Sequence, residues 1–499
     1  MSPRILPLIL ALGVLLSGIA PASAARIVPT PRASALPSTA TNRPFLGAAT
    51  SRQPVDLGAA GYVEREYLVS GLAQVHEWAA VGAGDRVQAR GPAQSYATRM
   101  LVRRPADAKR FSGRVVVELL SAAGGYDTAP LWGLSSAHFL RSGDVWIGLT
   151  VKPAAAVALR RFDPVRYARV DFAVAQSPDC KVEPAGTDHG LAWDILAQVG
   201  ALLRSSSKEN PLVDFDVRRL VAAGYAQAGG YVAAYVNIGH DRLRLGNERP
   251  VYDAYVDVAG AVGAAPINAC AAPLGATDPR REVLPRDVLV ITVMTQTDAA
   301  RTQWMRRADG DAADDLYRLY EIPGMAHAPG PAAGLPSAAD ARIAGIDPAL
   351  DAGCADTAST YPAGLAMNAI WQQLDDWLVA GIPLAKLPRL DVAADGAVHV
   401  DAFGNAVGGW RLPQLDVPLA VYAATSRARA DAPGTQGLCA LSGSMRRFEP
   451  ARLKALYGTR AAYLKRFNAA VDAAAAERRI TSADAVAAKA QGVKSAPQF

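Results

Sequence analysis

One stretch in the middle of the chain restricts the possible fold more than any other. Residues 220–223 form an apolar run, and apolar residues recur at helical spacing from Tyr231 onward. Small residues fill the turn between them, at Gly224, Ala226, Ala228, Gly229 and Gly230. This order predicts a buried strand, a very tight turn and a helix. Small residues on both sides of Ala226 let the backbone reverse so sharply that this central residue takes a strained conformation with its side chain exposed.

Similar apolar runs lie before and after this stretch, separated by segments with helical spacing. The runs that we expect to form further strands are residues 114–120, 144–151, 254–260 and 287–295. Helices are expected at residues 132–141, 154–162 and 190–203, and another around Ala313, Leu316 and Leu319. Nearly continuous apolar strands are typical of parallel strands that are buried on both faces. The alternation therefore predicts an α/β fold with a doubly wound, mostly parallel sheet.

The N-terminus has the pattern of a secretory signal peptide. Arg4 precedes an apolar run from Ile5 to Ile19, and small residues follow up to Ala25. A basic start, a short hydrophobic segment and a small-x-small site predict cleavage after Ala24. The alternative is a transmembrane anchor, but the run is short for a lipid bilayer. We therefore expect a secreted or periplasmic protein with no membrane span after cleavage.

Changes in composition divide the rest of the chain into three regions. After the signal peptide at 1–24, we expect a leader and N-terminal β region at 25–112 and an α/β core at 113–385. A C-terminal β and helical addition is expected at 386–499. The leader, from Arg26 to about Pro44, is rich in Pro, Ser, Thr and Ala and is expected to be extended or mobile.

The chain has four cysteines, Cys180, Cys270, Cys354 and Cys439. Export would place them in an oxidising compartment, where an even number favours two disulfide bonds. No pair has the C-x-x-C spacing of a redox or metal motif. Four cysteines allow three pairings, and the sequence does not choose among them.

Two further residues combine with Ala226 into the constellation for acyl transfer. That chemistry needs a nucleophile, a base within hydrogen-bonding distance, and a carboxylate that orients the base and stabilises its cation. Asp298 follows the strand expected at 287–295, and His327 lies in a later Gly-x-x-His loop. The chain order Ala226, Asp298, His327 is the order of nucleophile, acid and histidine that accompanies a strand–turn–helix nucleophile site. Alanine has no attacking atom, so the first member is missing.

Each of these features has a simpler interpretation. The turn could be an ordinary Gly-rich connection in another α/β fold, and Asp298 could be the N-cap of a helix. A lone histidine is most often structural or solvated. Asp287 and Asp311 compete with Asp298 for the role of acid, from poorer positions. Only His327 follows an acid-bearing strand end after the turn; the other histidines are His76, His138, His189, His240 and His399.

Composition and motifs argue against several other functions. Hydrophobic residues make up 51% of the chain and charged residues 20%, which indicates a globular protein. A net charge of +6 is modest for 499 residues, and the absence of a dense Lys/Arg block argues against nucleic-acid binding. The chain has no H-E-x-x-H, Walker or dinucleotide-binding motif, so neither a metal nor another cofactor is expected. The expected partner is a small ester-like substrate or ligand.

Several short motifs resemble those of the secreted bacterial proteins known as the "alpha/beta hydrolase domain" family. They occur at residues 116–118, 166–168, 224–231, 324–328, 404–409, 411–413 and 456–458. The resemblance implies an α/β-hydrolase fold and ester hydrolysis through a serine, with His327 as base and Asp298 as acid. It also implies an oxyanion hole made by the amide of Gln227 and by the loop near Ser121.

The chain departs from this family at the reactive position, where Ala226 replaces the serine of the typical Gly-x-Ser-Gln-x-Gly-Gly motif. The alanine could be an engineered Ser→Ala change or a natural loss that leaves a secreted, non-catalytic binding protein. Alternatively, His327 could activate water directly, or the Ser121 hydroxyl could attack. We therefore expect an exported relative of carboxylic ester hydrolases that is inactive or nearly so as its sequence stands.

Overall fold

The computed structural model describes residues 26–39, 42–79, 87–175, 180, 184–260, 265–275, 278–302, 306–328, 330, 334–347 and 353–498. The expected signal peptide, 1–24, lies outside the described residues. Within those residues, none of the helices combines the length and the apolar character that crossing a bilayer requires.

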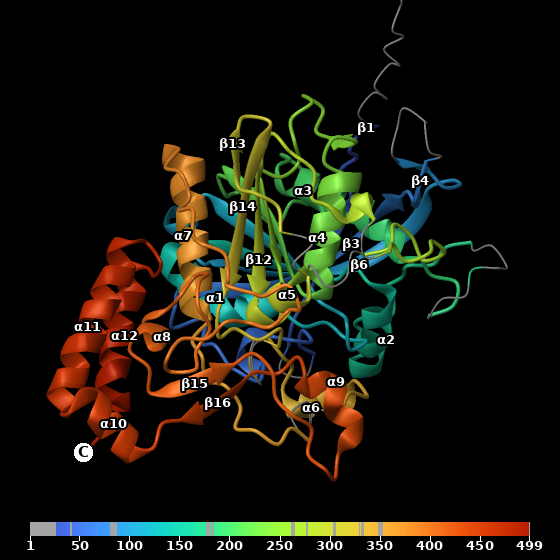
Figure 1. Ribbon diagram of the computed structural model, residues 1–499. Coiled ribbons are helices and arrows are strands. Elements are labelled where there is room, and N and C mark those ends of the chain that lie inside the picture. The colour runs from blue at the N-terminus through green and yellow to red at the C-terminus, as the bar shows by residue number, and fades with distance from the viewer. Residues whose placement is uncertain are drawn as a thin grey trace, which may run out of the picture.

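A single mixed sheet forms the centre of the protein (Figure 1). From one edge to the other its strands are β13 (Gly310–Ala312), β14 (Asp315–Ile322), β12 (Leu289–Thr295), β11 (Ala254–Val258), β9 (Arg219–Tyr225), β7 (Arg114–Leu119), β8 (Val145–Leu149), β6 (Gln94–Pro105), β3 (Tyr62–Ala73) and β2 (Arg32–Leu36).

The strands from β14 to β8 are parallel to one another, whereas β6, β3 and β2 at one edge and β13 at the other are antiparallel to their neighbours. Every residue of β7, β8, β11 and β12 is buried, as expected for parallel strands covered on both faces. The predicted α/β fold with a mostly parallel central sheet and an N-terminal β region is confirmed.

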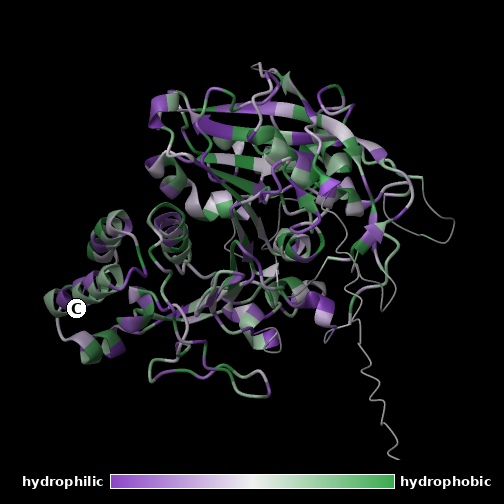
Figure 2. Cartoon of the chain, turned by 90° about the horizontal axis from the view of Figure 1, so that it is seen from above, coloured by the Kyte–Doolittle hydropathy of each residue, from purple (hydrophilic) through white to green (hydrophobic). Residues whose placement is uncertain are grey.

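Helices cover both faces of the sheet. On one face α1 (Pro130–Ser142) packs against α7 (Gly364–Ala380), while α3 (Ala192–Leu203) and α4 (Gln227–Ile238) lie on the other (Figure 1). Rings of α3 and α4 meet where Trp193 and Tyr231 have centroids 5.1 Å apart. In Figure 2 many residues of the strands are hydrophobic, and the helices carry both hydrophobic and hydrophilic residues. Shorter helices are α2 (Pro153–Phe162), α5 (Gln296–Arg301) and α6 (Ala338–Ile343).

The C-terminal part of the chain forms a separate group of elements below and beside the sheet in Figure 1. Its last helix begins after Thr481, whose side chain accepts the Asp484 N–H, so this threonine is the N-cap. The elements are α8 (Pro413–Asp416), β15 (Ala420–Ala423), α9 (Gln436–Cys439), β16 (Ser444–Arg447), α10 (Pro450–Tyr457), α11 (Arg460–Ala476) and α12 (Ser482–Ser495). Two small sheets near the N-terminal region pair β1 (Arg26–Ile27) with β10 (Leu243–Arg244), and β4 (His76–Trp78) with β5 (Val87–Ala89).

The prediction of a helix around Ala313, Leu316 and Leu319 is wrong, because this segment forms the antiparallel hairpin of β13 and β14. β14 also pairs in parallel with β12, and the last six residues of β14 are buried. The three-residue spacing of the two leucines also fits a strand that is buried on both faces, so pairing with β12 decides the structure.

The leader is extended rather than loose. Residues of β2 pair with β3, and two buried arginines hold the chain that follows. Arg166 donates to the Leu36 and Pro37 carbonyls, while Arg99 donates to the Phe45 carbonyl. The leader therefore belongs to the same packed body as the sheet.

Two disulfide bonds are present, Cys180–Cys270 and Cys354–Cys439. This is one of the three pairings that the sequence leaves open. The bonds close loops of similar length, with sequence separations of 90 and 85 residues.

Candidate active site

Ala226 lies at the turn between β9 and α4 in a conformation that L-residues rarely adopt, with φ 52° and ψ −122°. The turn is tight because Gly224 has no side chain: a Cβ there would lie 2.3 Å from the Ala228 carbonyl oxygen. Ala228 is fully buried. The Ala226 N–H donates to the Val258 carbonyl at 2.8 Å, which ties the turn to the end of β11. The methyl group of Ala226 therefore lies at a strained strand–turn–helix corner, which we call the elbow.

His327 and Asp298 form a hydrogen-bonded pair. The Nδ1 atom of His327 lies 2.9 Å from Asp298 Oδ1, and the Asp298 side chain is completely buried while 17% of the His327 side chain is exposed. The other carboxylate oxygen accepts the Thr295 hydroxyl at 2.6 Å. With Nδ1 facing the carboxylate, Nε2 is the ring nitrogen left to meet a ligand.

Neighbouring threonines place the pair. Thr295, the last residue of β12, is the N-cap of α5 and accepts the Asp298 N–H at 3.2 Å, so Asp298 itself is not the cap. The Thr297 hydroxyl accepts the His327 N–H at 3.1 Å. Both threonines closely precede Asp298 in the sequence, and this proximity is the signal that could have indicated their role.

Tyr225 connects the elbow to the histidine loop. Its hydroxyl donates to the His327 carbonyl at 2.8 Å, and the two rings have centroids 6.4 Å apart. Burial raises the pKa of this phenol well above its usual value, and the nearby Asp298 carboxylate raises it further, so the hydroxyl keeps its proton and donates. Sequence reasoning did not identify Tyr225.

A cavity of about 250 Å³ brings these groups together. Ala226, Ser121 and His327 all line it, so residues from the ends of β9 and β7 and from the loop after β14 share one space. The remaining described lining residues are Ala123, Thr128, Pro130, Tyr225, Gly324, Met325, Ala326, Ala328, Gly330, Leu335, Ala358, Ser359, Tyr361, Ala363, Leu438, Ser442 and Gly443.

The two residues assigned to the oxyanion hole differ in what their amides do. Gln227 is the first residue of α4, so its N–H has no acceptor within the helix. The Ser121 N–H donates to the Thr128 carbonyl at 3.0 Å and is therefore already engaged. A second oxyanion donor from this loop would come from the residues that follow Ser121, of which Ala123 lines the cavity.

The competing acids and histidines have other partners. Asp287 lies 2.7 Å from His240 Nε2, and Asp311 binds Arg318 and Lys386. The contacts of the other histidines are His76 with Asp194, His138 with Arg114, His189 with the Pro266 carbonyl and His399 with Asp391.

A second buried carboxylate, Asp257, lies behind the elbow. Its Oδ1 accepts the Gly260 N–H at 3.1 Å and would be 2.5 Å from a Cβ on Gly229, so it packs directly against α4. Burial raises the pKa of Asp257 to about 7, although the Gly260 N–H opposes this rise; the charge of Asp298 adds to it. Within the described ranges, no group of three or more His, Cys, Asp or Glu side chains is placed to hold a metal ion.

A family model described as "Alpha/beta hydrolase domain" matches residues 28–490. No curated protein matches the chain. Among solved structures, an esterase from Pseudomonas putida ECU1011 is similar at 13% identity over 66% of this chain and 86% of that chain, with a TM-score of 0.29.

Two other solved structures are similar to this chain at comparable identity and TM-score. A glucuronoyl esterase from Solibacter usitatus has 9% identity over 60% of this chain and 83% of that chain, with a TM-score of 0.27. A lipase/esterase from Lactobacillus plantarum has 10% identity over 50% and 87%, also with a TM-score of 0.27. Similarity at this level carries no argument about substrate.

Proposed function

The chain belongs to the alpha/beta hydrolase domain family, and from this membership we propose that it holds a small carboxylic ester in the cavity beside Ala226. One observation carries the proposal: Ala226 of the strained elbow and His327, whose ring is hydrogen-bonded to the buried Asp298, line the same cavity. These are the positions of nucleophile, base and acid in a Ser-His-Asp hydrolase.

In this proposal His327 is the base and Asp298 fixes its tautomer. The contact at Nδ1 orients the ring and would stabilise its cation. The free N–H of Gln227, at the positive end of the α4 dipole, would stabilise negative charge on the ester oxygen. The second oxyanion donor would come from the loop that begins at Ser121.

The side chain of Ala226 ends at a methyl group, so no acyl-enzyme can form at this position. The chain as it stands therefore binds esters and hydrolyses them weakly or not at all. Hydrolysis without a nucleophilic serine would proceed by attack of a water oxygen on the ester carbonyl carbon as the water gives a proton to His327 Nε2. The acyl C–O bond then breaks, and His327 returns the proton to the departing alkoxide, which leaves as the alcohol. Oxyanion stabilisation and binding alone can leave about 10³–10⁴-fold acceleration over water.

We also propose that the protein is exported. The sequence pattern at residues 1–24 supports this, as do the two disulfide bonds, which persist in oxidising compartments.

The test restores the missing atom. Ala226→Ser and the unchanged protein are compared by kcat/KM on p-nitrophenyl acetate and butyrate, and His327→Ala is then added to the serine variant. We expect a gain of at least about 10³-fold that the second change abolishes. Absence of a gain in a folded serine variant, with ester binding retained, would instead favour a binding protein that has lost catalysis altogether.

A further inference from the structure

Part of the cavity wall comes from outside the parallel core. Leu438, Ser442 and Gly443 lie in and just after α9, in the C-terminal addition. Ala358 and Tyr361 lie on the segment that precedes α7. These residues are more than 100 positions from Ala226 in the sequence, so the wall depends on contacts made only in the folded chain.

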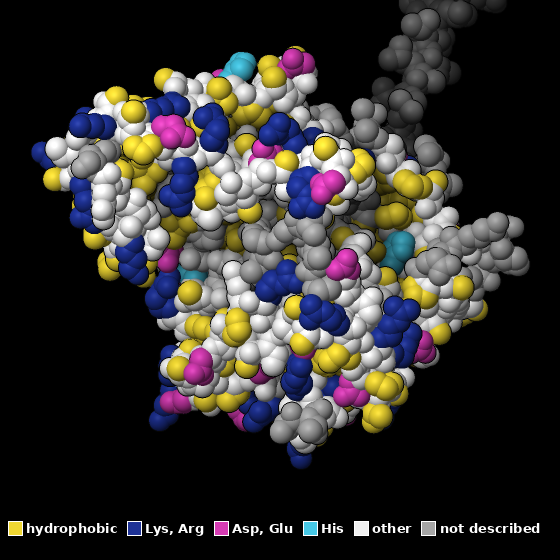
Figure 3. Space-filling model, turned by 90° about the horizontal axis from the view of Figure 1, so that it is seen from below, with side chains coloured by type: hydrophobic (Ala, Val, Ile, Leu, Met, Phe, Trp, Pro, Cys, Tyr) yellow, Lys and Arg dark blue, Asp and Glu magenta, His cyan; other side chains and the backbone are white. Residues whose placement is uncertain are grey.

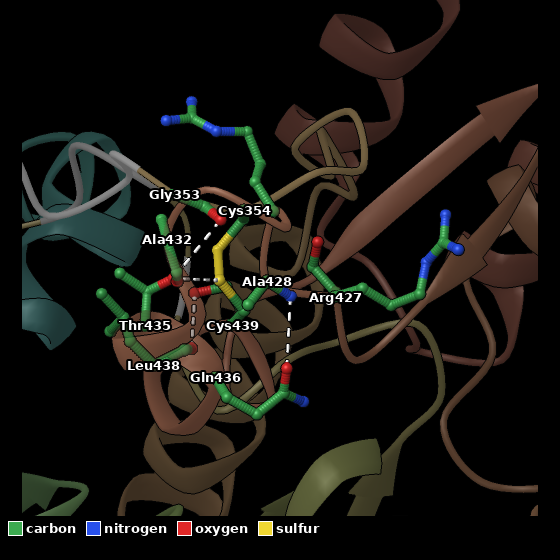
Figure 4. The surroundings of a disulfide bond; sticks show 12 residues. Gly353, Cys354, Arg427, Ala428, Ala432, Thr435, Gln436, Leu438 and Cys439 are labelled. Atoms are coloured by element: carbon green, nitrogen blue, oxygen red, sulfur yellow. Dashed lines mark hydrogen bonds between the residues drawn. A yellow bond between two sulfur atoms is a disulfide. The ribbon is translucent and has the colours of Figure 1, made fainter.

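The Cys354–Cys439 disulfide joins these two wall segments (Figure 4). The bond is next to Leu438 in the chain, and Cys439 is fully buried. Backbone hydrogen bonds continue the junction: Ser359 N–H donates to the Gly443 carbonyl at 3.0 Å. The two segments therefore form one disulfide-linked wall, which we define as residues 353–363 and 424–444.

The disulfide-linked wall also contacts the histidine loop. The N–H of Ala328, next to His327, donates to the Leu441 carbonyl at 2.8 Å. The hydroxyl of Thr297 donates to the Ala424 carbonyl at 2.8 Å while it accepts the His327 N–H. A shift of the wall would therefore move the cavity lining and the His327 backbone together.

Leu438 stands at the rim of the cavity. It lines the space, and 39% of its surface is exposed. The Ser442 hydroxyl donates to the Leu438 carbonyl at 3.0 Å and so holds the turn that carries Leu438. Figure 3 views the protein from below, the side of the wall; Lys and Arg side chains are spread over this face among apolar ones and do not gather in one patch.

The lining restricts the chemistry of the occupant. Among the described lining residues there is no Asp, Glu, Lys or Arg. An ester with a charged group in this space would lose hydration without meeting an Asp, Glu, Lys or Arg side chain of the described lining. The volume of about 250 Å³ lies below the range of roughly 300–1,000 Å³ that is common for drug-sized ligands.

We propose that Leu438, held in place by the Cys354–Cys439 disulfide, limits the length of the short, uncharged, apolar group that an ester places in this cavity. The inference rests on the proposed function, because it assumes that the ester lies beside Ala226. Each methylene beyond the limit would have to displace Leu438 from its position. Discrimination of about 10–200-fold per methylene is typical of apolar pockets.

The test compares Leu438→Ala with the unchanged side chain in two settings. In the Ala226→Ser background, kcat/KM is measured for p-nitrophenyl esters with acyl chains from acetate to decanoate, and for acetates of alcohols from ethanol to decanol. In the chain with Ala226, which does not form an acyl-enzyme, calorimetry measures the Kd of ethyl acetate, butyrate and hexanoate. Leu438→Ala should extend the accepted length in one of the two ester series and improve the longest esters at least tenfold.

Two matched controls isolate the effect. Val486→Ala truncates another exposed aliphatic side chain, on α12 and outside the cavity lining, and should change neither series. The double variant Cys354→Ser, Cys439→Ser should weaken the dependence of kcat/KM on ester chain length. The double variant Cys180→Ser, Cys270→Ser opens a loop of similar length and should leave this dependence unchanged. Circular dichroism confirms that each variant is folded; if Leu438→Ala does not fold, Leu438→Val replaces it.

An unchanged length profile in both ester series and in calorimetry overturns the proposal, even if Ala226→Ser is an active esterase. If the serine variant is inactive but the Kd series lengthens with Leu438→Ala, the size limit stands and only the proposed catalysis fails.

Discussion

The elbow and the histidine loop face the same cavity but are built in different ways. The turn of the elbow is made mainly within one continuous stretch, where Gly224 and Ala228 allow a turn that strains Ala226, and one hydrogen bond to Val258 ties it to β11. The histidine loop depends on three separate segments, through Asp298, Tyr225 and the Leu441 carbonyl. The side chain of Ala226 in the first of these regions ends at a methyl group, while the His327 loop is held by hydrogen bonds to distant segments. The hydrogen bonds around His327 are therefore formed in a chain that carries a methyl group at position 226.

The largest expected effect tests whether the histidine loop still functions. In the Ala226→Ser background, Asp298→Asn should lower kcat on p-nitrophenyl acetate by about 10⁴-fold, because an amide cannot hold His327 in the required tautomer. Asp311→Asn is the matched control, since Asp311 pairs with Arg318 and Lys386. Equal activity of both variants would contradict the dependence of His327 on Asp298, because His327 would then act without its acid.

Removal of each disulfide in turn distinguishes an effect on the stability of the protein from an effect on the geometry of the site. Serine replacements at either pair should lower the free energy of unfolding by about 4–5 kcal/mol, since the closed loops have similar separations of 85 and 90 residues. Urea unfolding measures this loss. Only the loss of Cys354–Cys439 should also raise KM in the Ala226→Ser background, because that bond supports the wall behind His327. An equal rise for both pairs would contradict the long-range support of the histidine loop.

Asp257 lies on β11, between β9, which leads into the elbow, and β12, which leads to Asp298. The ionisation of its carboxyl group gives a pH-dependent test. Its pKa is raised to about 7 in the folded protein from 3.8, so the folded chain holds a proton that the unfolded chain loses. The free energy of unfolding should therefore fall as pH rises from about 4 to about 7, by up to roughly 4 kcal/mol. Asp257→Asn should remove this contribution.

The measurement for Asp257 is the difference in unfolding free energy between the variant and its parent at several pH values. The difference is needed because burial lowers the pKa of His138 to about 3 and of His240 to about 4, and these groups destabilise the folded state as pH falls below about 6.5. A difference that does not vary with pH would mean that Asp257 is ionised throughout.

The smallest expected effect concerns strain at the elbow. Ala226→Gly should stabilise the protein by about 1 kcal/mol, because glycine adopts φ 52° without a Cβ penalty and this gain exceeds its larger loss of chain entropy. Gly381→Ala, at a positive φ in the C-cap of α7, is the opposite control and should destabilise. A destabilised Ala226→Gly variant would show that the methyl contacts in the cavity outweigh the strain.

Much of the fold could be predicted because its signals are local. Apolar runs identify the buried strands, and small residues around Ala226 identify the turn, since the steric limits of a tight corner act within a few residues. The β13–β14 hairpin was missed because Leu316 and Leu319 fit either structure until β12 supplies a pairing partner. The engaged Ser121 amide could not be foreseen either, since its acceptor is the carbonyl of Thr128 across the loop.

The sequence by itself determined the α/β order of elements, the strained corner at Ala226 and the absence of a nucleophile there. The sequence also favoured Asp298 over Asp287 and Asp311 as the partner of His327. Only the tertiary structure decided which cysteines pair, and that the distant residues Leu438 and Tyr361 line the cavity. The physical reason is that backbone preference and steric demand are set by near neighbours along the chain. Disulfide pairing and cavity walls are set by packing between segments whose separation in the sequence carries no information about their distance in space.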